Sequence, residues 1–138
     1  MLLPNLSATE ALGRRLAGLM RPGDAMLLEG ELGAGKSALA RAVLRSLTHD
    51  PALDVPSPTF TLVQEYDTPI GPVQHIDLWR LDGPAALAEL GWTDRPTVLV
   101  EWPDRLGPLR PADALTVALA HAGGDARTVR LAGWNGRL

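Results

Sequence analysis

The chain has 138 residues, of which 46% are hydrophobic and 21% are charged, and its formal net charge is −3. These values predict one globular domain over residues 1–138 and argue against an intrinsically disordered chain. The absence of cysteine excludes disulfides, thiolate metal sites and thiol catalysis, and it favours a cytoplasmic location. The apolar runs have the length of strands, so no membrane span is expected. The mildly acidic balance predicts no strong direct binding of nucleic acid.

The first predicted element is a helix that begins near residue 7. Ser7–Glu10 has the sequence of a capping box, in which a hydroxyl residue opens a helix and a glutamate follows three positions later. Leu12, Leu16 and Leu19 then recur at spacings of four and three, which places them on one helical face. Arg21–Asp24 contains a Pro-Gly pair and predicts a turn that ends the helix.

A strand, a glycine-rich loop and a second helix follow the turn. Ala25–Glu29 is a short apolar run, which is typical of a buried strand. Gly30–Gly35 predicts a loop, because three of its six residues are glycine. Lys36–Leu47 then has apolar residues at helical spacing.

The middle of the chain predicts a hairpin and a short helix. Thr59–Tyr66 contains β-branched and aromatic residues and predicts a strand. Thr68–Pro72 predicts a turn, and Val73–Leu78 predicts the antiparallel partner strand. Pro84–Leu90 predicts a short helix that opens at proline.

The last third of the chain predicts strands only. Thr97–Glu101 is an apolar run that predicts a buried strand, and Ala114–Ala120 alternates apolar and smaller residues. A turn at Gly123–Asp125 and a strand at Thr128–Leu131 complete a second hairpin. A strand–loop–helix unit followed by hairpins predicts an α/β domain whose mixed sheet has parallel central strands, an antiparallel portion and flanking helices.

One segment carries the chemistry of nucleotide binding. The residues from Gly30 to Ser37 match G-x-x-x-x-G-K-[ST], the phosphate loop of P-loop NTPases, and they stand between a predicted strand and a predicted helix. Glycines let backbone N–H groups surround phosphates, lysine is a compact cation for the β- and γ-phosphates, and the serine hydroxyl can bind Mg²⁺. The predicted nucleotide-binding residues of this segment are Gly30, Glu31, Leu32, Gly33, Ala34, Gly35, Lys36, Ser37 and Ala38.

The composition bears on the same lysine. Twelve of the 13 basic residues are arginine, and Lys36 is the single lysine. Arginine has a larger, planar head group, which does not suit a loop built around an ammonium. The Asn-Lys-x-Asp motif that reads guanine needs a second lysine, so ATP and ADP are favoured over guanine nucleotides.

Two carboxylates are candidates for holding Mg²⁺ or orienting the attacking water. Asp77 follows the predicted strand that begins at Val73, and Glu101 ends the buried strand that begins at Thr97. P-loop enzymes use a carboxylate at such a strand end. Lys36, Asp77 and Glu101 are therefore the predicted catalytic residues, and the division of roles between the two carboxylates stays open.

Four ordered segments together resemble the bacterial TsaE family, formerly YjeE. They are Gly30–Ser37, Ser57–Val63, His75–Leu81 and Glu101–Pro103. The resemblance covers nearly the whole chain. It implies a small P-loop ATPase that is needed to make the threonylcarbamoyl modification of adenosine 37 in tRNAs reading ANN codons. It also implies that a TsaB–TsaD complex is the partner and performs the transfer, so that tRNA is met through partners.

The resemblance also assigns roles to individual residues. Ser37 and Glu101 would hold Mg²⁺, and Asp77 would be a second acidic group toward the metal or the water. Further nucleotide contacts are implied for Thr9, Thr59, Thr61 and Trp102.

Two other functions are compatible with a phosphate loop. A small-molecule kinase would need an acceptor pocket and a lid, and a nucleotide-dependent binding switch would bind ATP with negligible hydrolysis. Among the remaining features, Trp79, Trp92 and Trp134 are expected to be packing residues, and His75 is expected to be structural.

Overall fold

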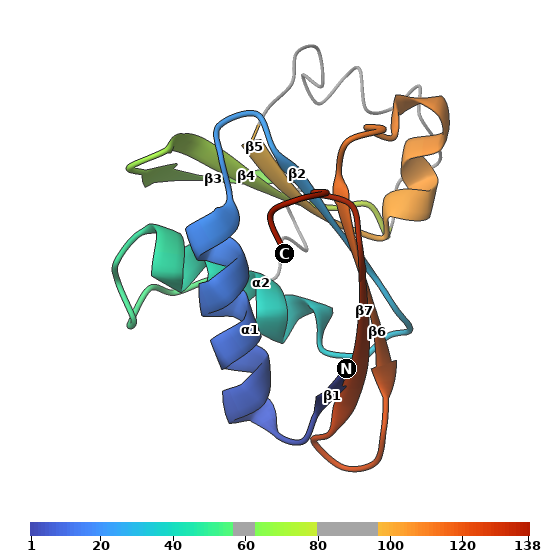
Figure 1. The fold of residues 1–138 in the computed structure, drawn as a ribbon. Coiled ribbons are helices and arrows are strands. Elements are labelled where there is room, and N and C mark those ends of the chain that lie inside the picture. Colours follow the sequence, from blue (N-terminus) through green and yellow to red (C-terminus); the bar gives the residue numbers. More distant parts are fainter. Residues whose placement is uncertain (57–62, 80–96) are drawn as a thin grey trace.

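The computed structural model describes residues 1–56, 63–79 and 97–138, which form one seven-stranded sheet with helices on both faces (Figure 1). The predicted helix at residues 84–90 and the first part of the strand predicted at residues 59–66 lie outside the described residues. The strands are β1 (Leu2–Leu3), β2 (Ala25–Glu29), β3 (Val63–Thr68), β4 (Gly71–Asp77), β5 (Thr97–Glu101), β6 (Leu115–His121) and β7 (Arg127–Ala132). The helices are α1 (Leu6–Leu19), α2 (Lys36–Leu47) and the 3-10 helix η1 (Pro103–Leu109).

The sheet is mixed, with its parallel part in the middle, as predicted. The strand order is β1-β7-β6-β2-β5-β4-β3. β2 pairs in parallel with both β5 and β6, and β4 pairs in parallel with β5. The outer pairs β1–β7, β6–β7 and β3–β4 are antiparallel. The carboxyl ends of β2, β4 and β5 therefore meet at one edge of the sheet, which is where ligands bind in open α/β sheets.

The two faces of the sheet are covered by different elements. On β2, Met26 and Leu28 pack with the apolar residues of α1 and α2, whereas Ala25 and Leu27 pack with Leu106 of η1. This alternation follows from the two-residue period of a strand. α1 and α2 consequently lie on the same face of the sheet, side by side, and η1 lies on the other (Figure 1).

The first helix begins earlier than predicted, and its cap is a different residue. The prediction of a capping box at Ser7–Glu10 is wrong, because the helix starts at Leu6 and Asn5 is its N-cap. The side-chain oxygen of Asn5 accepts a hydrogen bond of 2.9 Å from the backbone N–H of Ala8. Asn5 has extended backbone angles and a short acceptor, so it satisfies a free amide of the first turn.

Two elements of the structure were not predicted from the sequence. β1 has two residues, too few for any periodicity, and it exists because it pairs with β7. η1 contains Pro108, and it encloses Gly107 in a non-helical conformation, so its sequence predicts a loop. Within the described parts of the chain, no helix is long and apolar enough to cross a membrane.

Candidate active site

The phosphate-loop segment forms a tight turn between β2 and α2. Gly33 and Gly35 have positive φ angles of 81° and 103°, a conformation that costs glycine little and other residues more. Gly35 is the N-cap of α2, and its helix has no side-chain cap. The first amides of α2 therefore keep their hydrogen-bonding capacity for an anion, and the helix dipole favours negative charge there.

Gly30 has a different role from the one the motif suggests. A Cβ atom at this position would lie 2.5 Å from the carbonyl oxygen of Leu119 on β6, and φ is +148°. The close approach of the loop to β6 therefore requires glycine at this position, independently of phosphate binding.

We expect Gly30→Ala to lower the free energy of unfolding by about 2–4 kcal/mol, since both the backbone angle and the contact with Leu119 must change. Urea unfolding measures this loss. Gly18→Ala is the matched control, because a Cβ at Gly18 on α1 meets nothing within 4 Å. Alanine should stabilise that exposed helical position by up to ~1 kcal/mol. Equal stability of the two variants would contradict the packing role of Gly30.

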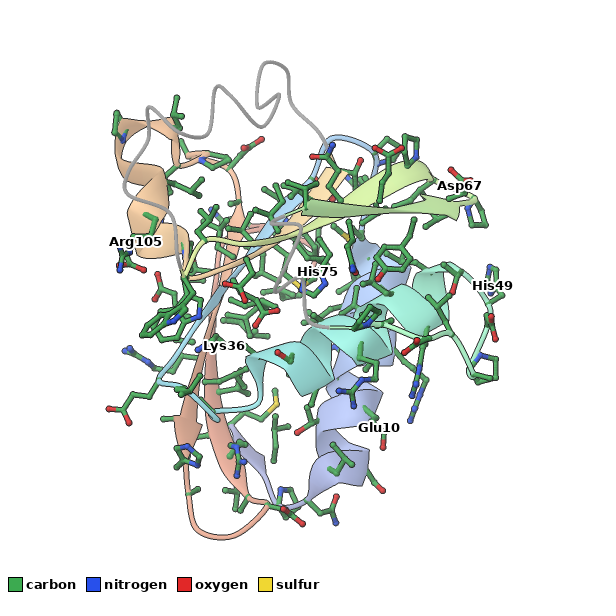
Figure 2. The ribbon with its side chains drawn as sticks, turned by 180° about the vertical axis from the view of Figure 1, so that it is seen from behind. Glu10, Lys36, His49, Asp67, His75 and Arg105 are labelled. Atoms are coloured by element: carbon green, nitrogen blue, oxygen red, sulfur yellow. The ribbon has the colours of Figure 1, made fainter. Side chains whose placement is uncertain are left out.

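Lys36 is enclosed by its own loop and one aromatic ring. Its side chain is on the first residue of α2, and the residue is 5% exposed (Figure 2). The ammonium donates hydrogen bonds to the carbonyl oxygens of Gly30 and Glu31, the second at 3.0 Å, and Nζ lies 3.8 Å from the ring centroid of Trp102. Burial lowers the pKa of Lys36, while Glu101 and other nearby carboxylates oppose that shift. A compact ammonium fits between these three groups.

Glu101 connects the phosphate loop to the interior of the sheet. The hydroxyl of Ser37 donates a hydrogen bond of 3.1 Å to Glu101 Oε1, and His75 Nε2 lies 2.7 Å from Glu101 Oε2. Glu101 is 3% exposed and His75 is 1% exposed. Residues 37, 75 and 101 come from α2, β4 and β5, so the tertiary structure joins them.

Asp77 is the neighbour of Glu101 across the sheet. The two residues are register partners at the ends of β4 and β5. Asp77 Oδ1 accepts a hydrogen bond of 2.9 Å from the backbone N–H of Trp79, which fixes the carboxylate. Burial raises the pKa of Asp77, and the charge of Glu101 adds to that shift, against the hydrogen bond from Trp79.

The raised pKa of Asp77 predicts a pH-dependent cost to stability. In the folded chain the protonated form is favoured, so the contribution of Asp77 is fully present below the ordinary aspartate pKa of about 3.9 and is lost as pH rises through the higher folded value. We expect Asp77→Asn to raise the Tm by about 1–3 °C at pH 7 without nucleotide, with the gain vanishing in acid. Thermal unfolding from pH 3.5 to 8 tests this. Asp67→Asn, which replaces an exposed carboxylate of β3, is the control, and it should leave the Tm at pH 7 close to that of the parent protein.

A cavity of about 230 Å³ unites these groups. It is lined by Leu32, Gly33, Gly35, Lys36, Ser37, Ala38, Asp77, Glu101 and Trp102. The structure thus brings together both predicted carboxylates, the lysine, the serine and the tryptophan. Trp102 has a left-handed backbone (φ 61°, ψ 54°), which is unusual for a tryptophan and directs its ring over Lys36.

The other predicted nucleotide contacts are Thr9, Thr59 and Thr61, and Thr9 does not line this cavity. Thr9 is buried and lines a smaller cavity of about 100 Å³, together with Gly35 and Ala38. This cavity lies beside the start of α2. Thr59 and Thr61 lie outside the described residues.

Sequence reasoning missed two contacts of the site. Trp79 is 48% exposed rather than packed in the core, and its ring contacts that of Trp102 at an interplanar angle of 45°, with the centroids 4.3 Å apart. Trp134, by contrast, is buried in the core as expected, and Trp92 lies outside the described residues. The contact of His75 with Glu101 is the second. The sequence held one indication of it: His75 precedes Asp77 by two positions, so both side chains lie on the same face of the strand.

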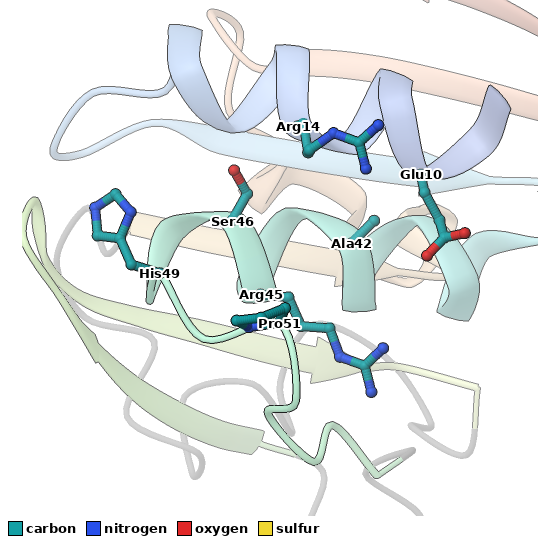
Figure 3. A pocket seen from close by; sticks show the side chains of 7 residues that line it. All are labelled: Glu10, Arg14, Ala42, Arg45, Ser46, His49 and Pro51. Atoms are coloured by element: carbon teal, nitrogen blue, oxygen red, sulfur yellow. The ribbon is translucent and has the colours of Figure 1, made fainter. Parts of the chain in front are cut away.

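A cavity of about 350 Å³ lies apart from the phosphate loop, between α1 and the second half of α2 (Figure 3). Ala42 and Ser46 of α2 line it, and Glu10 and Arg14 of α1 flank it on the opposite side. None of the residues that line it belongs to the phosphate loop or to the two carboxylates. Although this cavity is larger, its lining lacks the groups of the candidate active site.

The donors at the loop suit a Mg²⁺ that is shared with a nucleotide. Ser37 and Glu101 supply a hydroxyl and a carboxylate, which are oxygen ligands of the kind Mg²⁺ prefers. Among residues 1–56, 63–79 and 97–138, no group of three or more His, Cys, Asp or Glu could hold a metal by itself. Phosphate oxygens and water would complete the coordination, as in P-loop NTPases.

Comparison with known proteins agrees with this fold and loop. A family model described as "Threonylcarbamoyl adenosine biosynthesis protein TsaE" matches residues 3–129. The tRNA threonylcarbamoyladenosine biosynthesis protein TsaE of Bacillus subtilis is 30% identical over 129 residues, which cover 91% of this chain and 79% of that protein. The protein of the same name from Synechocystis is 39% identical over 114 residues, covering 78% of this chain and 71% of that protein.

A solved structure supports the same fold and family. The crystal structure of YdiB from Bacillus subtilis superposes with a TM-score of 0.76 and 27% sequence identity, covering 99% of this chain and 86% of that one. The fold is therefore the P-loop α/β fold. From the family match and these relatives, we conclude that the chain belongs to the TsaE family.

Proposed function

We propose that this protein is a Mg²⁺-dependent ATPase that serves as an accessory subunit in the N6-threonylcarbamoylation of adenosine 37 in tRNAs reading ANN codons. The observation that carries the proposal is the hydrogen bond between Ser37, in the phosphate loop, and Glu101, at the end of β5. It supports the proposal because P-loop enzymes hold a nucleotide-bound metal with a hydroxyl of the loop and a carboxylate at a strand end. The role in tRNA modification rests on membership of the TsaE family.

The loop supplies the groups that bind the phosphates. The amides around Gly33 and Gly35 and the beginning of α2 would donate hydrogen bonds to phosphate oxygens. Lys36 would move from the carbonyl oxygens of its own loop to the β- and γ-phosphates, because an anion attracts an ammonium more strongly than a neutral carbonyl does. Thr9 and Trp102 would border the rest of the nucleotide, and the contacts of Thr59 and Thr61 stay predictions.

The two carboxylates would have different roles, one in binding the metal and one in orienting the water. Ser37 and Glu101 would hold Mg²⁺, which supplies positive charge to the transferring phosphoryl group when it is bound. Asp77 lines the same cavity without a bond to Ser37. We assign Asp77 to the orientation of the attacking water, with a secondary role near the metal. Its raised pKa suits a group that accepts a hydrogen bond from water.

The charge balance supports a division of labour with partners. A chain with a net charge of −3 has no overall positive charge to attract the phosphates of tRNA. We therefore propose that the TsaB–TsaD complex performs the threonylcarbamoyl transfer and that this protein couples ATP turnover to its cycle. Such a role implies that the protein acts in the cytoplasm, where tRNA is modified.

The test of the proposal measures phosphate release from ATP by the protein alone, then with TsaB–TsaD, and in parallel the formation of threonylcarbamoyladenosine on tRNA. We expect release that needs Mg²⁺ and modification that needs all three proteins. Tight ATP binding without phosphate release, even with the partners, would favour a binding switch instead. A phosphorylated metabolite formed without the partners would favour a kinase.

A further inference from the structure

One arginine holds the phosphate loop from the side of β7. The guanidinium of Arg127, the first residue of β7, donates hydrogen bonds to two carbonyl oxygens of the loop: Nε to Ala34 at 3.0 Å and Nη2 to Gly33 at 3.2 Å. Its Nη1 donates to Gly124 at 2.7 Å and to Ala126 at 2.8 Å, in the turn between β6 and β7. Figure 1 shows the loop between β2 and α2 lying beside these two strands.

These bonds fix the direction of the peptide group between Ala34 and Gly35. In a planar trans peptide the C=O and the N–H point in opposite directions. Because Arg127 holds the oxygen of Ala34 on the β7 side, the N–H of Gly35 points away from β7. Within the described parts of the chain, no backbone acceptor is bonded to this N–H. Gly35 also lines the cavity that contains Lys36 and Ser37.

We propose that Arg127 is a positioning residue of the nucleotide site, which orients the Gly35 amide for phosphate and ties the phosphate loop to the β6–β7 turn. The inference rests on the proposed binding of ATP and ADP, and it adds a residue that lies outside every motif of the sequence. Arg127 also lines the smaller cavity with Thr9, and so does Asp125 of the β6–β7 turn.

The geometry explains why this residue is arginine. A guanidinium offers five N–H donors in a rigid planar fork, and four of its hydrogen bonds here go to carbonyls of two separate segments. A lysine ammonium is a point donor and cannot reach both segments at once. Since all four acceptors are neutral carbonyls, the role depends on shape and donor number rather than on positive charge.

The experiment compares Arg127→Lys and Arg127→Gln with the matched control Arg130→Gln. Arg130 is an exposed arginine on the same strand. We expect both Arg127 variants to weaken Mg²⁺-ADP binding by about 10-fold in titration calorimetry, and to raise the KM for ATP while kcat changes little. Amide hydrogen exchange should quicken at residues 31–35 but not in β2, and the control should match the parent protein. If the glutamine variant does not fold, the lysine variant carries the test.

Three outcomes separate the possibilities. Parent-like ADP affinity and exchange in Arg127→Gln would overturn the positioning role. Full rescue by Arg127→Lys would overturn it too, since charge alone would then suffice. Failure of the parent protein to bind any nucleotide would instead overturn the proposed function, and the exchange at residues 31–35 would still decide whether Arg127 braces the loop.

Discussion

Lys36→Ala should reduce ATP hydrolysis by about 10²–10³-fold, measured as phosphate release in the presence of TsaB–TsaD. The loss follows from the removal of the one cation that the phosphate loop itself supplies, in a site where Lys36 is enclosed by the loop and by Trp102. Lys36→Arg should not restore turnover, because the guanidinium is too large for the space between the carbonyl of Gly30 and the indole ring.

Arg130→Ala is the control for this substitution, because it removes one positive charge from an exposed position of β7. It should leave turnover within about two-fold, since exposed charges interact weakly across solvent. Circular dichroism and thermal unfolding of Lys36→Ala would show that the fold is intact. Unchanged turnover in the Lys36→Ala variant, with the partners present, would contradict the central role of the phosphate loop.

Glu101→Gln should weaken the binding of Mg²⁺-ADP by about 10²-fold and that of metal-free ADP by much less. The carboxylate accepts a hydrogen bond from Ser37, so it puts a negative charge beside the hydroxyl that we expect to bind the metal. Glutamine keeps the size of the side chain and an acceptor for the Ser37 hydroxyl, and it removes the charge. Calorimetric titration with and without Mg²⁺ gives the difference directly.

Asp77→Asn is the comparison that divides the roles of the carboxylates. If Asp77 orients water, this variant should bind Mg²⁺-ADP with nearly parent-like affinity and lose phosphate release by about 10²-fold. If instead Glu101→Gln loses affinity equally with and without Mg²⁺ while Asp77→Asn loses only the Mg²⁺-dependent part, the metal role belongs to Asp77. The assignment would then be reversed.

The contact with His75 gives Glu101 a second constraint. One oxygen of the carboxylate is held by the buried imidazole and the other faces Ser37. A carboxylate that is bonded on one side presents its second oxygen in one direction, as ligands supported by outer hydrogen bonds do at metal sites. This arrangement accounts for the buried histidine on β4, whose imidazole has a carboxylate partner.

Much of the fold could be predicted from the sequence because its signals are local. The apolar runs of β2 and β5, the helical spacing of α1 and α2, and the glycine turns between β6 and β7 each depend on neighbouring residues. The phosphate loop and its lysine were identified in the same way, from eight consecutive residues. Among the differences, Asn5 replaced the predicted helix cap, which is a local error, whereas the two-residue β1 depends on its pairing with the distant β7.

The sequence by itself determined the class of the protein. A strand, a phosphate loop and a helix in that order, with one lysine in the loop, specify a P-loop nucleotide site, because the spacing of the glycines and the lysine within a single turn is a property of the local backbone. The further segments then indicated the TsaE family, which the comparisons confirmed.

Only the tertiary structure decided which distant side chains meet at that loop. Ser37 and Glu101 are 64 positions apart, and Arg127 is 93 positions from Ala34, yet each pair is hydrogen-bonded. These contacts depend on the strand order, which places β5 on one side of β2 and β6 and β7 on the other. Strand order is set by the packing of whole faces and by register across the sheet, and no short segment of sequence carries that information.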